Sequence, residues 1–458
     1  MPRGRHVSAS GTRWLGRWRV VRGPLAFYLL FLLGGILLLR MDPFGLTRLT
    51  KMYSQDLLAV AMAGCYPGAP DGPCVKDGKA AIAVVLLRDP DLAAYDEPWP
   101  PRYGFHARVL KAIRANQPKA LVIDIVFEDV RDDPTIEALA AELDRYRAAG
   151  IPVYGASFGV DRPLRPEVGS RLTPVQVPKT IDPLDRVTRF YALATGPPQS
   201  QPTAVPTVFK EVCGGCPGDA GCGTGPVRVF WSELPEQSWN ESWLDCRRTP
   251  PFPQWIVQDR GTDFRENCPS APTIPAGLLL EPTEEADTAI ESLVSGSVVF
   301  YGAFYHGAAD AMNTPLHNDL PAVFLHAAAL DNLITLGPDA VRHKERMVTL
   351  LGVSLPDFLL LAIIGAVLVL RRSSQRLARA WTRLMQRVRS RVVRIVLIVF
   401  GSQIGLLVLL CGATAWLACH VGVSEWLLGI NFLFAITWTE VLDVTGKLVE
   451  AADEFETS

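Results

Sequence analysis

Long apolar runs divide the chain into membrane-type and globular stretches. Four runs are almost free of charged side chains, and they cover residues 24–41, 348–370, 395–417 and 425–442. A helix needs roughly 20 apolar residues to cross a bilayer, so the pattern predicts about four transmembrane helices. A cleaved signal peptide is the alternative for the first run. No small-x-small cleavage site stands at its end, where Leu38, Leu39 and Arg40 lie, and this favours an uncleaved anchor.

Residues 42–346 alternate between continuous apolar runs and apolar residues at helical spacing. The continuous runs, typical of strands buried on both faces, cover 80–87, 120–127, 152–158 and 297–304. The helical stripes cover 46–63, 104–116, 133–149 and 320–336. Strands alternating with helices across short loops predict an α/β domain, a mostly parallel sheet with helices on both faces. Between about 160 and 275 the residues are rich in Pro, Gly and Cys, which predicts a long disulfide-tied insertion with a few strands such as 227–233.

Charge is strongly segregated along the chain. Residues 1–23 carry six Arg and residues 371–394 carry nine, both without an acid, whereas residues 42–346 hold 28 Lys+Arg against 39 Asp+Glu, a net charge of −11. Loops rich in Lys and Arg remain cytoplasmic. This predicts a multi-pass protein of the inner (cytoplasmic) membrane, with both termini, residues 371–394 and the acidic tail 443–458 inside, and residues 42–346 periplasmic or extracellular. A large acidic domain argues against a nucleic-acid partner.

Cysteine usage agrees with an outside location, where disulfides persist. Seven of the nine cysteines lie in the outside segment, and we expect disulfides among Cys65, Cys74, Cys213, Cys216, Cys222, Cys246 and Cys268. The Cys213-x-x-Cys216 spacing lies in a Gly-rich stretch and not at a helix start, so nothing there lowers a thiol pKa for redox chemistry. A zinc site needs a second such pair. Structural disulfides are therefore favoured, and the odd cysteine is free or bridges two chains.

Residues 371–394 also have the pattern of an amphipathic helix. Leu377, Trp381 and Leu384 belong to one face, whereas arginines recur every three or four residues on the other. Such a helix is typical of a segment lying on anionic lipid. The same arginines, Arg379, Arg383 and Arg387 in particular, form a candidate docking face for an acidic cytoplasmic partner.

Polar side chains gather where the expected strands end, the edge at which open parallel sheets bind ligands. The candidate ligand-binding residues are Asp89, Asp91, Trp99, Arg102, Asp124, Glu128 and Asp310. Carboxylates there suit a cation, or a cationic or polyhydroxylated ligand, with Trp99 packing as a rigid lid. Asp89 and Asp91 are equally explained as turn residues. Asp124 lies within an expected strand and needs a partner, which could be Arg102, so a structural ion pair is as well supported as a ligand contact. His326 is typical of a hydrogen-bonded core histidine.

Several of these segments resemble the second type of CHASE domain. The resemblance is carried by residues 89–102 (DPDLAAYDEPWPPR), 122–127 (VIDIVF), 298–301, 310–315 and 320–327. It implies an extracytoplasmic sensory domain of a bacterial signalling protein, which usually has one anchor helix before the sensor and about three spans after it. The chain departs from the family at Trp99-Pro-Pro-Arg102, at Ala322 and in its Cys-rich insertion, which leaves the ligand open.

Two functions are compatible with these patterns. The resemblance favours a bacterial membrane-anchored receptor for an unidentified small extracytoplasmic ligand or a stress. Family members commonly end in an output module, and only residues 443–458 follow the last expected span here, so we expect a signalling effector in trans. The alternative is a structural or scaffolding subunit of a cell-envelope complex, favoured by the disulfide-tied insertion and the missing output. No spacing typical of a nucleophile or acid–base pair stands out, so no enzyme activity, cofactor or metal is expected; the expected partners are membrane lipid, the effector and a second copy in a homodimer.

Overall fold

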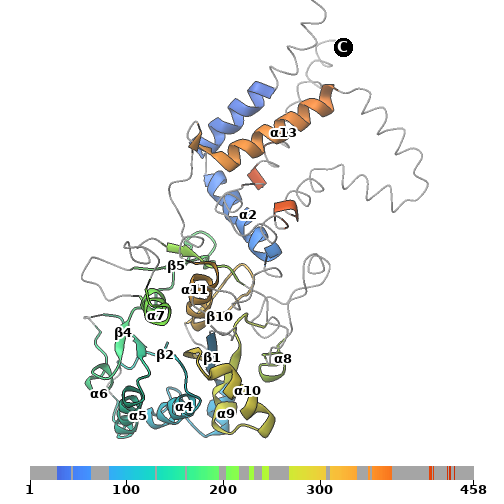
Figure 1. Ribbon diagram of the computed structural model, residues 1–458. Helices are drawn as coiled ribbons and strands as arrows, with labels where there is room; N and C mark the ends of the chain where they lie inside the picture. Colours follow the sequence, from blue (N-terminus) through green and yellow to red (C-terminus); the bar gives the residue numbers. More distant parts are fainter. Residues whose placement is uncertain are drawn as a thin grey trace, which may run out of the picture. The chain divides into compact units, whose positions relative to one another are not determined.

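The computed structural model describes residues 28–42, 45–62, 82–128, 131–159, 162–194, 203–215, 226–231, 240–246, 268–305, 310–337, 349–350, 353–373 and a few positions between 412 and 438. The chain divides into two compact units. The α/β unit is Ala59–His343, and the helical unit combines Met1–Leu58 with Lys344–Ser458. Figure 1 labels the helices and strands of both units.

A parallel sheet of six strands forms the centre of the α/β unit. Its order is β4-β3-β2-β8-β1-β7, and every neighbouring pair is parallel. The strands are β1 (Ile82–Arg88), β2 (Ala120–Ile123), β3 (Val153–Ala156), β4 (Thr173–Val175), β7 (Thr273–Pro275) and β8 (Val298–Phe304). The four continuous apolar runs form the four central strands, which confirms the α/β fold expected from the sequence.

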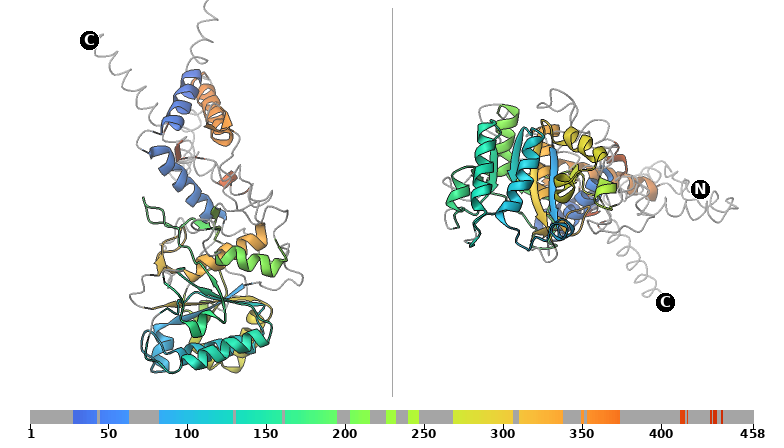
Figure 2. Two further views of the ribbon diagram at one scale, coloured as in Figure 1. Left: turned by 90° about the vertical axis from the view of Figure 1, so that its left-hand side faces the viewer. Right: turned by 90° about the horizontal axis from the view of Figure 1, so that it is seen from below.

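Helices cover both faces of this sheet, as Figures 1 and 2 show. One face carries α4 (Tyr103–Ala115), α5 (Ile136–Ala148), α9 (Ala276–Leu280) and α10 (Glu284–Val294); the other carries α7 (Ala204–Cys213) and α11 (Val323–Leu336). Successive strand residues point to opposite faces. Ile123 and Tyr301 belong to the core beneath α4 and α5, so Val122 and Gly302 point toward α11. Each expected helix ends within three residues of the observed one.

The stretch 160–275 contributes more to the sheet than a separate insertion would. Its strands β4 and β7 form the two edges of the six-stranded sheet, and its helix α7 packs on α11. The expected strand at 227–233 is seen as β6 (Pro226–Arg228), which pairs antiparallel with β5 (Phe190–Ala192). The remaining short elements are α3 (Asp89–Ala94), α6 (Pro166–Gly169), α8 (Asn240–Trp243), β9 (Ala311–Met312) and β10 (Leu320–Pro321).

Disulfides are present in this stretch, as its cysteine content indicates. Cys246 and Cys268 form one, with Cα atoms 5.1 Å apart and a sequence separation of 22 residues. Cys213, at the end of α7, is also disulfide-bonded. Cys65, Cys74, Cys216 and Cys222 lie outside the described residues.

The helical unit includes the helix Tyr28–Met41, α2 (Leu46–Met62), whose last four residues belong to the α/β unit, and α13 (Leu355–Ser373). A short pair of strands, β11 (Thr349–Leu350) and β12 (Val353–Ser354), precedes α13. Within the described part, no single helix has the length and apolar content to cross a membrane; Tyr28–Met41 and Leu46–Ala59 pass this test together but are bent by 94°. The expected spans 395–417 and 425–442 fall mostly on residues that are not described. The four-span topology therefore stays a prediction.

Candidate functional site

Asp124 lies at the carboxyl edge of the sheet, directly after β2. That strand ends at Ile123, earlier than its apolar run suggests, so Asp124 is beyond the strand and not inside it, which corrects the sequence expectation. The ladder still extends to this residue because its N–H donates to the Tyr301 carbonyl oxygen, 2.8 Å away. Strand alternation then directs the Asp124 side chain to the face that α11 covers.

The Asp124 carboxyl meets His326 of α11 in the protein interior. His326 Nε2 is 3.6 Å from Asp124 Oδ2, and their side chains are only 1% and 6% exposed. Burial lowers the pKa of His326 to about 3, so its imidazole is neutral at physiological pH. Within the described part of the chain, Asp124 Oδ2 and His326 Nδ1 have no hydrogen-bond partner. The imidazole therefore contributes no positive charge to the carboxylate.

Two further charged groups act on Asp124. Burial raises the pKa of Asp124 well above its ordinary value, the negative charge of Asp310 raises it further, and the positive charge of Lys179 opposes both. Lys179 is itself held in place, since its Nζ donates to the Ala311 carbonyl oxygen at 2.5 Å. The result is an acidic cluster of Asp124, Lys179, Asp310 and His326, in which the ionised form of Asp124 is disfavoured.

Tyr191 of β5 borders this acidic cluster. Its fully buried ring packs edge-on against the His326 ring, with centroids 5.5 Å apart. Burial raises the pKa of Tyr191, and the nearby charge of Asp124 contributes to the rise. Tyr191 therefore closes one side of the acidic cluster with an aromatic ring.

The opposite face of the same strands carries a neutral pair. His106 Nδ1 and the Tyr301 hydroxyl lie 2.9 Å apart, and both residues are buried. Burial lowers the pKa of His106 to about 3. This pair satisfies its own hydrogen bond inside the core, so it is explained by packing alone.

Trp99 belongs to the same sheet edge. Its ring stacks on Tyr305, the residue after β8, with centroids 3.5 Å apart and 40% of Trp99 exposed. The two prolines that follow Trp99 are fixed by Arg131, whose NH1 donates to the carbonyl oxygens of Pro100 and Pro101 at 3.0 and 3.1 Å. The position of the Trp99 ring at this edge is thus fixed by its neighbours.

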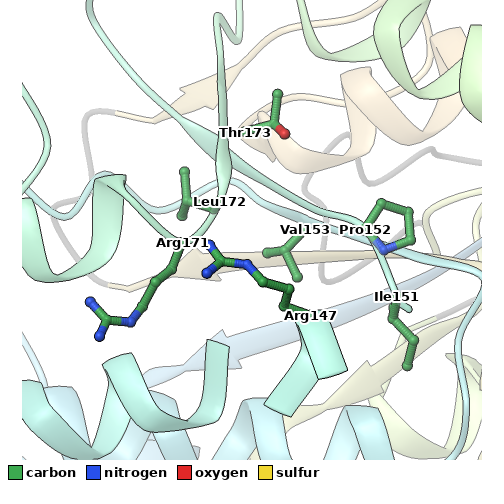
Figure 3. A pocket seen from close by; sticks show the side chains of 7 residues that line it. All are labelled: Arg147, Ile151, Pro152, Val153, Arg171, Leu172 and Thr173. Carbon is green, nitrogen blue, oxygen red and sulfur yellow. The ribbon is translucent and has the colours of Figure 1, made fainter. Parts of the chain in front are cut away.

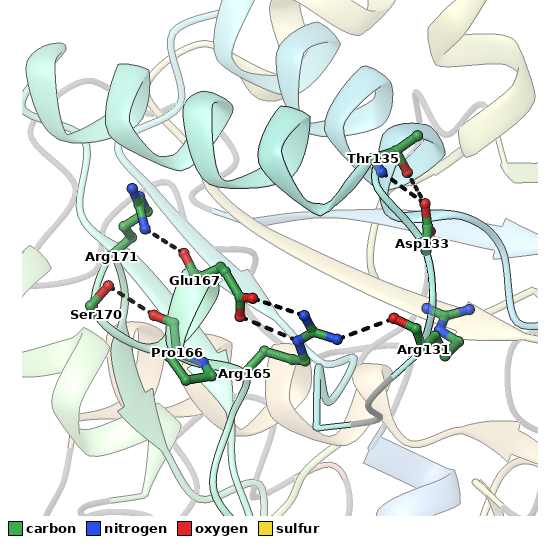
Figure 4. A network of polar contacts seen from close by, with 8 residues as sticks. All are labelled: Arg131, Asp133, Thr135, Arg165, Pro166, Glu167, Ser170 and Arg171. Carbon is green, nitrogen blue, oxygen red and sulfur yellow. Dashed lines mark hydrogen bonds and ion pairs between the residues drawn. The ribbon is translucent and has the colours of Figure 1, made fainter.

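A network of polar contacts supports Arg131 (Figure 4). The guanidinium of Arg165 donates to both carboxylate oxygens of Glu167, at 2.8 and 3.2 Å, and its NH1 donates to the Arg131 carbonyl oxygen. These hydrogen bonds from Arg165 lower the pKa of Glu167 to about 2. Asp133 and Thr135, nearby in the sequence, accept the N–H groups of Tyr103 and Gly104 and so cap the start of α4. These contacts therefore hold the Trp-Pro segment in place directly before the start of α4.

The remaining expected site residues make local contacts. Asp91 is buried and accepts the backbone N–H and Nε of Arg88, so it caps α3 as a turn residue does. Asp89 lies exposed in the first turn of that helix. Glu128 pairs with Arg162. Arg102 is exposed before α4, and His326 takes the place beside Asp124 that Arg102 was expected to fill.

Asp124 and Asp310 are thus the two expected residues that the fold brings into one cluster. Lys179 was missed because it lies in the irregular stretch 160–275, where periodicity carries no signal. His326 is buried, as expected of a core histidine, but its Nδ1 has no hydrogen-bond partner among the described residues. Nothing in its helix pattern points to a carboxyl neighbour.

A pocket among the described residues lies away from the acidic cluster, near the amino ends of β3 and β4 (Figure 3). It measures about 230 Å³ and is lined by Arg147, Ile151, Pro152, Val153, Arg171, Leu172 and Thr173. Both arginines already pair with Asp144, so this hollow is less suited to an anion than its arginines suggest. No group of three or more His, Cys, Asp or Glu side chains in the described ranges is arranged to hold a metal ion.

Comparison with known families accounts for this architecture. Residues 28–371 match the CHASE2 domain, which is three quarters of the chain. No curated protein and no solved structure matches the chain significantly. CHASE2 domains are extracytoplasmic, membrane-associated sensory domains, so the match gives the chain a general role in sensing. The observed α/β unit, the segments around Trp99 and Asp124, and this match agree: the chain belongs to the CHASE2 domain family.

Proposed function

We propose that this protein is a membrane-anchored receptor that binds a small extracytoplasmic ligand at the acidic cluster and signals to a separate cytoplasmic effector. The observation that carries the proposal is Asp124, a buried carboxyl at the sheet edge that faces a neutral imidazole 3.6 Å away. A buried carboxylate that is not fully compensated is unfavourable in a folded domain. Such groups gather at functional sites, because there the ligand supplies what the fold does not.

The chemistry of the cluster indicates the class of ligand. An ammonium group, or a hydroxyl-rich molecule with several donors, would give Asp124 Oδ2 the hydrogen bonds that the described residues do not supply. The Tyr191 ring borders the cluster beside His326, and Trp99, stacked on Tyr305 and 40% exposed, offers an aromatic surface next to β8. A cationic or polyhydroxylated small molecule fits both features.

Asp124→Asn tests this assignment because it separates stability from binding. We expect the variant to be at least as stable as the parent at pH 7, since Asn cannot ionise. We also expect it to lose ligand-dependent stabilisation, which for the parent is about 2.7 kcal/mol at a ligand concentration of 100 Kd. The measurement is thermal unfolding of the full chain in lipid nanodiscs, screened against small amines, polyamines and sugars. Asp89→Asn, an exposed carboxyl on the same edge, is the matched control and should keep the ligand response.

The pH dependence has a definite sign. The pKa of Asp124 is raised in the folded state, so its protonated form stabilises the fold. That contribution is complete below the unfolded pKa of about 4 and is lost as pH rises through the folded pKa. The stability advantage of Asp124→Asn should therefore be largest at pH 7 and shrink toward pH 4. A strongly destabilised variant that keeps the ligand response would contradict the proposal and favour a structural or scaffolding role.

The effector part of the proposal is supported by the arginine-rich segment 371–394. Replacing Arg379, Arg383 and Arg387 with Gln keeps the apolar face and six other arginines of that segment. We expect membrane insertion to survive and capture of cytoplasmic partners from detergent extracts to fall. Capture by the parent should itself weaken as the salt concentration is raised. Arg3, Arg5 and Arg13 replaced with Gln give a control with the same change of charge. Equal capture by both triple variants would show that the segment only binds lipid.

A further inference from the structure

Asn431 is a buried polar residue that touches both helices flanking the α/β unit in the sequence. It is 1% exposed. Its Nδ2 donates to the Thr47 carbonyl oxygen at 3.2 Å and to Thr50 Oγ1 at 3.0 Å, both in α2. Its backbone N–H donates to Asp357 Oδ1 of α13 at 2.9 Å. One side chain and its own backbone thus join the helix before the α/β unit to the helix after it.

The partners of Asn431 are fixed by further hydrogen bonds. Asp357 Oδ2 accepts the Ser354 hydroxyl at 2.7 Å, which orients the carboxylate toward Asn431. Ser54 of α2 is fully buried, and its Oγ accepts the N–H of Leu433 at 3.1 Å. Asn431 Oδ1 accepts the N–H of Phe434 at 3.1 Å. The contacts form a connected network and not an isolated bond, and connected buried networks resist partial rearrangement.

Trp438, seven residues after Asn431, makes a second contact, with the helix Tyr28–Met41. The indole N–H of Trp438 donates to the Phe31 carbonyl oxygen at 3.1 Å. Its ring lies so close to Gly34 that a Cβ there would be 2.7 Å from Trp438 Cζ2. Glycine also allows the helix Tyr28–Met41 to pack against α13, since a Cβ on Gly365 would be 2.9 Å from the rings of Tyr28 and Phe31. The helical unit is therefore closely packed around Asn431 and Trp438.

We propose that Asn431 is a positioning residue that couples α2 to α13, so that a change in the α/β unit moves both helices as one body. This proposal rests on the receptor function proposed above and adds its transmission step. A ligand acts on an equilibrium between two states only through its different affinity for them. Because sliding of α2 past α13 would break the Asn431 hydrogen bonds, a shift of α2 is passed to α13, and α13 carries it toward the inner side. Buried groups left without partners make such sliding unfavourable.

Hydrogen exchange of the full chain in lipid nanodiscs tests the coupling without a ligand or an effector. Asn431→Leu keeps the number and branching of the side-chain heavy atoms and removes the amide contacts to Thr47, Thr50 and Phe434. The backbone N–H to Asp357 remains, so the variant cuts the connection on the α2 side. We expect faster exchange in α2 and α13, and also, by linkage, an exchange change of roughly fivefold or more in α11 and β8 of the α/β unit. Ser54→Ala is a milder second variant should Asn431→Leu fail to insert, with the same expected direction. Tyr53→Phe, an exposed position of α2, is the matched control and should change neither unit.

The outcomes separate the possibilities. Faster exchange confined to α2 and α13 would make Asn431 a packing residue only and overturn the coupling. Unchanged exchange in all four elements would show that the Asn431 hydrogen bonds contribute nothing. Neither result depends on Asp124 or on ligand screening, so failure of the receptor proposal is recognised separately.

Discussion

Replacing Arg114 with Leu is expected to lower the free energy of unfolding of the α/β unit by about 3 kcal/mol. Arg114 of α4 donates from Nε to Glu142 Oε1 of α5 at 2.6 Å. The Glu142 side chain is only 2% exposed. Removing the arginine leaves this buried carboxylate with Arg145 alone, which contacts the other oxygen from a side chain that is 59% exposed. Urea unfolding of the full chain, with hydrogen exchange in α4 and α5 as the probe, measures this loss in the free energy of unfolding.

The matched control for this ion pair is Arg145→Leu. Because Arg145 is 59% exposed and its charge is screened by solvent, this variant should lose far less stability, about 1 kcal/mol or less. The double variant Arg114→Leu/Glu142→Leu should recover much of the loss, because no buried charge remains without its partner. A cost for Arg145→Leu as large as that for Arg114→Leu would show that burial of Glu142 does not set the energy of this contact.

Replacing Gly302 with Ala should cost about 2–3 kcal/mol and also disturb the acidic cluster. Gly302 lies in β8 beneath the start of α11, where an added Cβ would be 2.6 Å from Val323 Cβ. A Cβ so near to the backbone cannot rotate away, so α11 itself must move. His326 lies three residues further along that helix, and its 3.6 Å contact with Asp124 would open. Thermal unfolding measures the stability loss, and NMR titration of the His326 ring measures the change at the cluster.

Gly155 provides the matched control within the same sheet. Its added Cβ would also meet an atom at 2.6 Å, but that atom is Leu172 Cδ2, the end of a flexible side chain. Gly155→Ala should therefore cost less than about 1 kcal/mol and leave His326 unchanged. Adding Val323→Ala to Gly302→Ala should rescue only in part, because the Val323 Cβ remains. If both variants lose the same stability, the close approach of α11 to Gly302 does not explain the cost of Gly302→Ala.

The layout of the α/β unit follows from its hydrophobic pattern. Continuous apolar runs such as 80–87 and 120–127 match strands that need apolar cover on both faces, and helical stripes supply that cover, so alternation along the chain implies a parallel sheet. The motif around Trp99 likewise identifies the family before any tertiary contact is known. In both cases the signal is local, since side-chain period and short motifs are properties of neighbouring residues.

Where the hydrophobic pattern has no clear period, tertiary pairing determines which residues form strands. β4 and β7 are three residues each, too short for an alternation to be read, and they become edge strands only because β3 and β1 offer unpaired backbone groups. The stretch 160–275 therefore looks like an insertion in the sequence and completes the sheet in the structure.

Asp124 shows the same division at the level of one residue. Asp124 is unusual in the sequence because an ionisable side chain in an apolar run needs a partner. Its neighbours could not be found there, because His326 and Lys179 come from segments about 200 and 55 residues away that meet only once α11 packs on β8. Local patterns thus determined the elements and the family, whereas the environment of each buried charge was decided by which distant surfaces the packed core brings together.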